Sequence, residues 1–312
     1  MELVRGLHNI SQGHRGCVLT VGNYDGVHLG HQQMVGALTA RASQLDSPAT
    51  VLVFEPSSKE FIDPDGAPPR LTRWREKYLA LAALGVQRLV TLRFDDCMRA
   101  MTPRSFVDEL IVARLGARHM VVGDDFRYGS NACGTIESLR AAGVAHGFGV
   151  EQIPPFVIGG VRVSSTAVRE RLEFGDFPGA ARLLGRPYRM LGRVVHGRGL
   201  GRELGFPTAN LRLMRRKPPM WGILAVWAHG IDAHPLPAVA SLGTRPTVDG
   251  IEPLLEVHVF DFSGDLYGRA IEVEFVAKLR DEVKFDSLDA MMMQMKVDAA
   301  RARDLLSKVD SG

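Results

Sequence analysis

The sequence is poor in cysteine and has no long apolar run. Its three cysteines, Cys17, Cys97 and Cys133, are far apart and form no Cys-x-x-Cys pair. This spacing excludes a compact cysteine metal site and a dense disulfide framework, and it favours a reducing cytoplasm. No apolar segment approaches the roughly 18 residues of a membrane-spanning helix, and residues 1–10 carry charged and histidine side chains. We therefore expect neither secretion nor membrane spanning.

An excess of charge of one sign is also missing. The 312 residues carry 38 basic and 35 acidic side chains, a formal net charge of +3. This balance argues against a surface that binds nucleic acid or an anionic membrane, so we expect the partners to be small molecules. With 46% hydrophobic and 23% charged residues, the chain is long enough for two packed domains.

The first part of the chain, residues 1–184, has the pattern of an α/β domain. A clear helix is expected from Thr102, its N-cap, through Pro103 to Gly116. Repeated strand–helix–strand units predict a doubly wound parallel sheet, in which ligands bind beyond the carboxyl ends of the strands. The predicted strands are 17–22, 50–55, 88–94, 119–123 and 150–153.

The pattern changes after Leu184, and residues 187–312 are predicted to form a second domain. Pro187 disfavours helix at the break. Six strands follow without intervening helices, which indicates an antiparallel β-barrel. A terminal helix from about Ser287 packs a methionine-rich face against that barrel. The predicted strands are 190–196, 208–213, 223–229, 238–242, 254–260 and 271–277.

A glycine-rich turn, Thr20-Val-Gly-Asn-Tyr-Asp-Gly-Val-His-Leu-Gly-His31, leads from the first of these strands into a helix. Gly22 and Gly30 allow a phosphate to approach the backbone. His28 and His31 stand where a helix N-terminus offers free amides. A surface histidine pair or a two-histidine metal site is the alternative, but no His-Glu-x-x-His pattern supports a metal site. The turn therefore favours phosphate chemistry.

This turn resembles the signature of the nucleotidyltransferase superfamily, in the version found in bifunctional riboflavin kinase/FAD synthetases. Four further segments keep the family's order. They are Phe54-Glu-Pro56, Arg70-Leu-Thr-Arg73 with Glu76 and Lys77, Val122-Gly-Asp-Asp-Phe-Arg-Tyr-Gly129, and Arg162-Val-Ser-Ser-Thr-Ala-Val-Arg169. The resemblance covers essentially the whole chain. It implies that ATP and Mg²⁺ are used to convert riboflavin to FMN and FMN to FAD.

The resemblance also implies roles in adenylyl transfer. His28 and His31 would stabilise charge at the α-phosphate and on departing pyrophosphate; the attacking FMN phosphate is already anionic and needs no strong base. An ordinary serine cap with solvated arginines, and core packing for the aromatic residues, are the alternatives. The residues implied for ATP are Gly22, Asp25, Gly30, Asp125, Arg162, Ser165, Thr166 and Arg169, and those implied for the flavin are Phe54, Phe126 and Tyr128.

A second glycine-rich segment precedes a predicted barrel strand, and it has neither a Walker A nor a Rossmann pattern. Gly197, Gly199 and Gly201 would form an arch of backbone amides suited to polyphosphate. Thr208 and Asn210, two apart on a strand, point to one face and can offer neutral oxygens to Mg²⁺. A structural Thr-x-Asn is the alternative. With the Gly-Phe-Pro before them, these residues resemble the signature of riboflavin kinases.

A glutamate on the predicted strand 254–260 is the candidate base. The apolar residues of this strand alternate, which turns Glu256 and His258 to the opposite face. A carboxylate on a rigid strand is well placed to accept the proton of the ribityl 5′-hydroxyl. A solvated surface glutamate is the alternative, but residues 255–262 with the following Leu-Tyr-Gly resemble the riboflavin kinase pattern, which implies Glu256.

Two departures from the family pattern concern the flavin pocket. Ser57 and Ser58 stand where many relatives have His-Pro, and Trp221 and Leu224 stand where relatives have Asp and Tyr. An adenylyltransferase with a weakened kinase domain and a flavin-binding regulatory protein are therefore the alternatives to a bifunctional enzyme. The intact histidine and Thr-x-Asn motifs favour the enzyme, which we expect to be a monomer or a weak oligomer.

Overall fold

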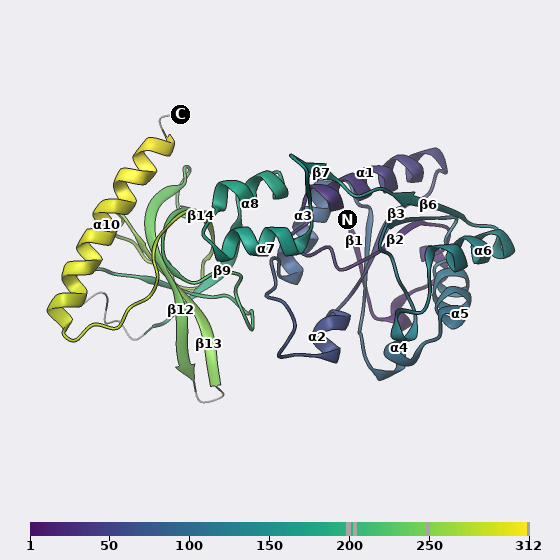
Figure 1. The fold of residues 1–312 in the computed structure, drawn as a ribbon, viewed down its shortest axis with the longest axis horizontal. Helices are drawn as coiled ribbons and strands as arrows, with labels where there is room; N and C mark the ends of the chain where they lie inside the picture. Colours follow the sequence, from purple (N-terminus) through teal and green to yellow (C-terminus); the bar gives the residue numbers. More distant parts are fainter. Residues whose placement is uncertain (198–200, 202–204, 248–249, 311–312) are drawn as a thin grey trace. The chain divides into compact units, whose positions relative to one another are not determined.

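The structure, a computed structural model, describes residues 1–197, 201, 205–247 and 250–310 (Figure 1). By its packing the chain forms two compact units. The first consists of residues 1–68 and 74–163, and the second of residues 69–73 and 164–312. Each unit has its own sheet and its own core, so each is described by itself.

The first unit is built on a six-stranded sheet of order β1-β4-β3-β2-β5-β6, in which all the paired strands are parallel. This confirms the predicted fold of the N-terminal part. The strands are β1 (Glu2–Arg5), β2 (Val18–Val21), β3 (Ala49–Phe54), β4 (Arg88–Leu92), β5 (His119–Gly123) and β6 (Gly149–Ile153). The helices are α1 (Leu29–Gln44), α2 (Ser58–Ile62), α3 (Trp74–Ala83), α4 (Asp96–Ala100), α5 (Pro103–Ser105), η3 (Phe106–Arg114) and α6 (Ile136–His146).

Alternate residues of the strands supply two cores, one on each face of the sheet. Val18 of β2 packs with α1 and α3, whereas its neighbour Leu19 packs with η3 and α6. Figure 1 shows these helices on both faces. Because β3 and β4 lie on one side of β2 and β5 lies on the other, the strand order reverses between β2 and β5. Ligands of doubly wound sheets bind at such a reversal.

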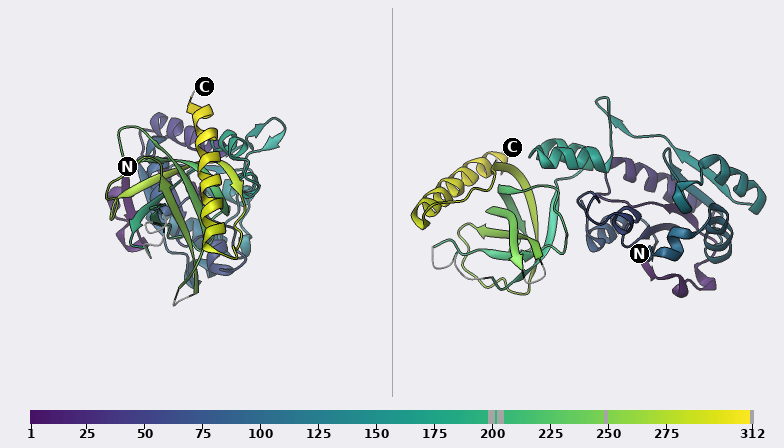
Figure 2. Two further views of the ribbon diagram at one scale, coloured as in Figure 1. Left: turned by 90° about the vertical axis from the view of Figure 1, so that its left-hand side faces the viewer. Right: turned by 60° about the horizontal axis from the view of Figure 1, so that its bottom comes forward.

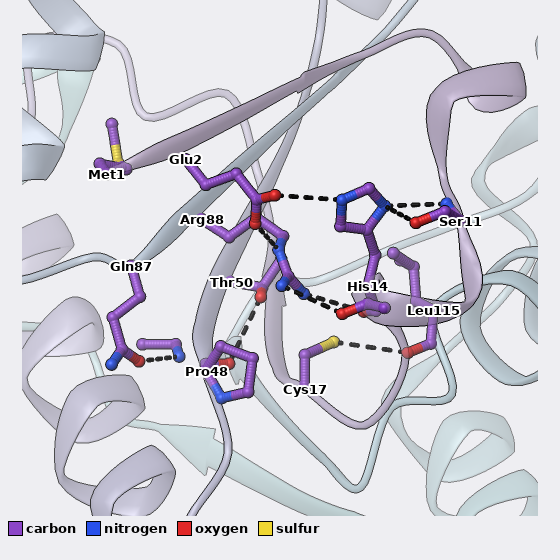
Figure 3. A network of polar contacts seen from close by, with 12 residues as sticks. Met1, Glu2, Ser11, His14, Cys17, Pro48, Thr50, Gln87, Arg88 and Leu115 are labelled. Atoms are coloured by element: carbon purple, nitrogen blue, oxygen red, sulfur yellow. Dashed lines mark hydrogen bonds and ion pairs between the residues drawn. The ribbon is translucent and has the colours of Figure 1, made fainter.

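Strand β1 was not predicted from the sequence, because a four-residue edge strand with two charged side chains carries no apolar alternation. A polar network holds it (Figure 3). Arg88, 8% exposed, donates from Nε to Glu2 Oε2 at 2.6 Å and from Nη1 to the His14 carbonyl at 2.9 Å. The Arg88 hydrogen bond is the main cause that holds the pKa of Glu2 below its ordinary value.

The helix predicted from Thr102 is present but differs in type. Thr102 is the N-cap, its side chain accepts a hydrogen bond from the Ser105 amide, and Pro103 opens the helix as expected. From Phe106 to Arg114, however, the backbone forms a π-helix. Composition cannot distinguish this wider winding from an α-helix, since both bury an apolar face.

The second unit contains a closed antiparallel barrel of order β10-β13-β12-β11-β14-β9, which confirms the predicted six strands. Helix α10 runs along the outside of the barrel (Figure 2) and contacts β11, β12 and β14. The strands are β9 (Arg189–Val195), β10 (Ala209–Arg212), β11 (Gly222–His229), β12 (Leu236–Thr247), β13 (Gly250–Val259) and β14 (Ala270–Arg280). Among the residues that the structure describes, the helices of this unit are α7 (Ser165–Glu173), α8 (Phe177–Leu184) and α10 (Leu288–Asp310).

A short segment from early in the sequence, residues 69–73, also belongs to the second unit. Arg215, 5% exposed, donates from Nη1 to the carbonyls of Arg70 and Leu71, both at 2.8 Å, and to Tyr188 Oη at 3.0 Å. The Tyr188 hydroxyl in turn donates to the Leu71 carbonyl at 2.9 Å. Leu71 is fully buried. Arg215 therefore binds this segment to the barrel unit.

We expect Arg215→Ala to destabilise the second unit. The change removes a buried cation that makes three hydrogen bonds, and the loss of charge-assisted bonds of this kind costs about 3 kcal/mol in total. Thermal unfolding followed by circular dichroism should show a melting temperature lower by roughly 10 °C. Arg212→Ala, at an exposed position of β10, is the control. Equal melting temperatures for the two variants would show that Arg215 does not hold the segment.

Candidate active sites

The first site is the turn between β2 and α1. His28 is the N-cap of α1 and is 6% exposed; its Nδ1 accepts a hydrogen bond from the His31 amide at 3.3 Å. In a neutral ring, Nε2 of His28 then carries the proton and is a donor. The rings of His28 and His31 stack with centroids 3.7 Å apart. Both predicted histidines thus meet at a helix N-terminus, which attracts anions.

His31 is kept neutral by its surroundings. Burial, followed by the charges of His28 and Lys77, holds the pKa of His31 well below its ordinary value. Its Nδ1 is buried and, within the described part of the chain, has no hydrogen-bond partner. A buried polar atom without a partner is unfavourable, so this nitrogen indicates a place for a bound water or ligand.

The turn itself has an unusual backbone. Tyr24 and Val27, both 1% exposed, adopt φ values of 48° and 45°, a region that non-glycine residues rarely occupy. The Tyr24 hydroxyl lies 2.7 Å from Thr20 Oγ1 and anchors the turn to β2. Two predicted phosphate residues, Gly22 and Asp25, lie in this same turn. Such left-handed residues cluster at ligand sites, which agrees with the predicted role of the turn.

An ion-pair network joins the segment after β5 to the hairpin formed by β7 (Val157–Ile158) and β8 (Val161–Arg162). Arg162 makes a two-pronged ion pair with Asp124, Nη1 to Oδ2 at 2.9 Å and Nη2 to Oδ1 at 2.7 Å, and Nη2 lies 3.5 Å from Asp125 Oδ2. A Cβ added to Gly30 would lie 3.3 Å from the His28 ring and 3.4 Å from the Val163 carbonyl. The structure thus places Asp125 and Arg162 on one ion-pair network, and the chain beside Arg162 against the start of α1.

The predicted flavin residues lie in or against one apolar cluster. Phe54 and Phe126 are half-buried at its edge, whereas Tyr128 is 6% exposed and its hydroxyl lies 2.9 Å from Ser138 Oγ. Tyr128 therefore packs as a core residue. Ser57 caps α2, with its Oγ accepting from the Glu60 amide at 3.4 Å.

The remaining predicted ATP residues lie on α7, which belongs to the second unit. Ser164 is the N-cap of this helix, and its Oγ accepts from the Ala167 amide at 3.2 Å. Arg169 donates from Nε to the Pro69 carbonyl at 2.7 Å. The approach of Ser165, Thr166 and Arg169 to the histidine turn stays a prediction from the sequence.

The second site is a row of polar residues across three barrel strands. Asn210 of β10 is paired with Glu256 of β13, and Glu256 is paired with Ser241 of β12. Directly paired residues share one face of a sheet. The other face is apolar, since the paired residues Leu211 and Leu255 are both fully buried. The predicted metal residue and the predicted base are therefore neighbours, and Ser241 is a member of the row that the sequence did not identify.

Two glycines of the glycine-rich segment, Gly197 and Gly201, lie close to the two predicted metal residues. A Cβ added to Gly197 would lie 2.3 Å from Asn210 Nδ2, and one added to Gly201 would lie 2.4 Å from the Phe206 carbonyl and 3.3 Å from Thr208 Oγ1. Any larger residue would push Asn210 or the loop away. The backbone at Gly197 and Gly201 is thus close to the two side chains. The third predicted glycine, Gly199, lies outside the described residues.

We expect Gly197→Ala to impair the reaction at this second site and to leave the first site unaffected. The new methyl group would overlap the Asn210 amide, and a displacement of about 1 Å in an active site commonly costs about 10²-fold in rate. Rates of the two reactions should be measured separately. Gly36→Ala is the matched control, because nothing lies within 4 Å of a Cβ placed there. An unchanged second-site rate would show that the Asn210 position is not critical.

The two departures from the family pattern in the barrel lie in different surroundings. Leu224 is fully buried and paired with Ala240, whereas Trp221 is 37% exposed. A feature that the sequence analysis missed is the stacking of His196 on Tyr267, with centroids 3.9 Å apart. Tyr267 belongs to the Leu-Tyr-Gly segment, so the motif itself was the available signal.

Two families of known proteins match this chain in order along its length. Residues 10–167 match the family described as FAD synthetase, and residues 184–306 match the family described as riboflavin kinase. The bifunctional riboflavin kinase/FMN adenylyltransferase of Pseudomonas fluorescens is 47% identical over 306 residues, with 98% of each chain covered. The proteins of the same name from Escherichia coli K12 and Haemophilus influenzae are 46% and 42% identical, with 97% of this chain covered in each case.

A solved structure supports the fold over nearly the whole length. The chain resembles a Streptococcus pneumoniae protein described as a macrolide-efflux protein, with a TM-score of 0.80, 31% identity, and 96% and 97% of the two chains covered. Within the helices that the structure describes here, none is long and apolar enough to cross a membrane.

Proposed function

This chain belongs to the bifunctional riboflavin kinase/FMN adenylyltransferase family, and from that premise we propose how its residues divide the work. The protein phosphorylates riboflavin to FMN and adenylylates FMN to FAD. The observation that carries this conclusion is the match of both families, in order, on one chain. We propose that residues 1–184 carry adenylyl transfer and that residues 187–312 carry the kinase.

In the proposed kinase site, Glu256 accepts the proton of the ribityl 5′-hydroxyl as that oxygen attacks the γ-phosphate of ATP. Its position opposite Asn210 supports this role, because the base then stands beside the residue proposed to hold the metal. The backbone near Gly197 and Gly201 would bind the polyphosphate.

Mg²⁺ fits the donor set of this site. Asn210 and Thr208 offer neutral oxygens, which suit a hard cation. The described residues contain no cluster of three or more His, Cys, Asp or Glu side chains arranged for a metal. Mg²⁺ usually takes only one or two ligands from the protein and the others from ATP and water. When bound, the ion would neutralise charge on the phosphates.

In the proposed adenylyltransferase site, the phosphate of FMN attacks the α-phosphate of ATP, and pyrophosphate leaves. The nucleophile is already an anion, so the residues position the phosphates and stabilise charge. His28 and His31 would donate hydrogen bonds to phosphate oxygens at the start of α1, assisted by Arg162. The buried Nδ1 of His31 supports such a role, since it has a hydrogen-bonding capacity to satisfy.

We further infer that the protein works in the cytoplasm as a monomer or weak oligomer. Cys17, Cys97 and Cys133 are free thiols, which suits a reducing compartment. Burial raises the pKa of Cys17 to about 11, so this thiol stays protonated at neutral pH.

The direct test is incubation with riboflavin, ATP and Mg²⁺, followed by chromatography. FMN should appear first and FAD later. A second incubation starts from FMN instead of riboflavin. If FAD forms in that incubation but no FMN forms from riboflavin, the kinase domain is weakened, which the Trp221 and Leu224 departures would explain. Absence of both products, with flavin bound, would indicate a binding protein instead.

A further inference from the structure

Arg162 sits on an element that cannot hold it in place by packing alone. The β7–β8 hairpin has two residues in each strand and turns through Gly159 and Gly160, at φ 55° and 80°. Its apolar residues Val157 and Val161 are 51% and 40% exposed. A two-stranded hairpin of this size is marginally stable in water. The Arg162 side chain therefore needs an anchor elsewhere.

Asp124, the residue after β5, is that anchor. Its two carboxylate oxygens accept one hydrogen bond each from the two terminal nitrogens of Arg162, at 2.7 and 2.9 Å. This pairing fixes the plane of the guanidinium. The pair with Asp124 takes two of the five N–H donors of the guanidinium, and Nη2 also lies 3.5 Å from Asp125 Oδ2, so an arginine held in this way still has donors to offer another anion. Asp124 is less exposed than Arg162, at 29% against 49%, so the carboxylate is the more firmly packed partner.

The chain next to the anchored arginine lies against the histidine turn. The Val163 amide donates to the Phe156 carbonyl at 2.8 Å, which closes the base of the hairpin, and Val163 is 4% exposed. The Val163 carbonyl lies 3.4 Å from the position of a Cβ on Gly30, and the His28 ring lies 3.3 Å from the same position. One residue beyond Arg162, the chain thus touches the start of α1.

We propose that Asp124 is a positioning residue for adenylyl transfer: it holds the Arg162 guanidinium at the start of α1, ready for the triphosphate of ATP. This inference deepens the proposed adenylyltransferase site and rests on it. The pairing also offsets the negative charge that Asp124 would otherwise present to a polyanion. Because Asp124 already holds the Arg162 side chain in one conformation before ATP binds, less conformational entropy is lost on binding.

The test is Asp124→Asn, assayed with saturating FMN. Asparagine keeps one acceptor oxygen but turns an N–H₂ group toward an arginine N–H, so the two-pronged pair is lost. The KM for ATP in FAD formation should rise roughly tenfold, about 1.4 kcal/mol, with a smaller change in kcat and no change in FMN formation. Asp108→Asn is the matched control, because Asp108 also pairs with an exposed arginine in this unit. An unchanged or lower KM for ATP would overturn the proposal.

A double-mutant cycle separates positioning from a general effect on the fold. In an Arg162→Ala background, Asp124→Asn should raise the KM for ATP no further. A second tenfold rise there would show that Asp124 acts independently of Arg162 and would overturn the proposal. A wild-type KM in Arg162→Ala alone would instead remove Arg162 from the proposed ATP site. Thermal unfolding of each variant should show that the first unit stays folded.

Discussion

His28→Ala is expected to cut FAD formation from FMN by roughly 10² or more, the usual cost of losing a group that stabilises charge in the transition state. FMN formation from riboflavin should stay close to the wild-type rate, because His28 belongs to the first unit and the row around Glu256 belongs to the second. The two rates are measured separately by chromatography, the first with FMN and ATP, the second with riboflavin and ATP.

His28 is also the N-cap of α1, so alanine removes a capping bond that is worth about 1 kcal/mol. His28→Asn separates the two effects, since asparagine is a good N-cap but has no imidazole. Both variants should lose FAD formation. Recovery of the rate in His28→Asn would assign the effect to the cap. His8→Ala, at an exposed position in the same unit, is the control for a histidine change. Equal loss of both reactions in His28→Ala would contradict the division of residues.

Glu256→Gln should have the mirror effect. Glutamine keeps the size of the side chain and one acceptor oxygen but removes the basic carboxylate, and removal of a general base typically costs 10² to 10⁴-fold, as an order of magnitude. FMN should no longer form from riboflavin at a useful rate, whereas supplied FMN should still give FAD. The same chromatographic assay measures both.

Glu252→Gln is the matched control for this change, because Glu252 is an exposed residue of the same strand. It should retain both reactions. A normal kinase rate in Glu256→Gln would show that Glu256 is not the base. A loss of both reactions with a lower melting temperature would show that the carboxylate is needed for the fold of the barrel.

Much of the fold was accessible from the sequence, because its signals are local. The buried strands of the parallel sheet are short apolar runs in the sequence. The helix N-caps at Thr102 and Ser164 have the residue types typical of caps. Strand β1 was missed because its position depends on the long-range bonds of Arg88 to Glu2 and His14. Residues 69–73 pack in the second unit through bonds to main-chain carbonyls, which leave no pattern in the sequence.

The candidate sites were predictable to a similar degree. Motif resemblance named His28, His31, Asn210 and Glu256 individually. The pairing of Asn210 with Glu256 could not be predicted, because it depends on the register of strands that are far apart in the sequence. Asp124 was not predicted for a related reason: its proposed positioning role depends on Arg162, which is 38 residues away in the sequence. In each case the proposed role depends on a contact between distant segments rather than on a residue type alone.

Mixing the two variants tests the central claim, that separate residues of one chain carry the two reactions. His28→Ala and Glu256→Gln are combined with riboflavin, ATP and Mg²⁺, and the products are followed by chromatography. The account predicts that the mixture makes FAD from riboflavin although neither variant does so at a useful rate alone, because one supplies FMN and the other consumes it. A mixture that accumulates neither FMN nor FAD, from two folded variants, would show that the reactions share these residues and would contradict the account.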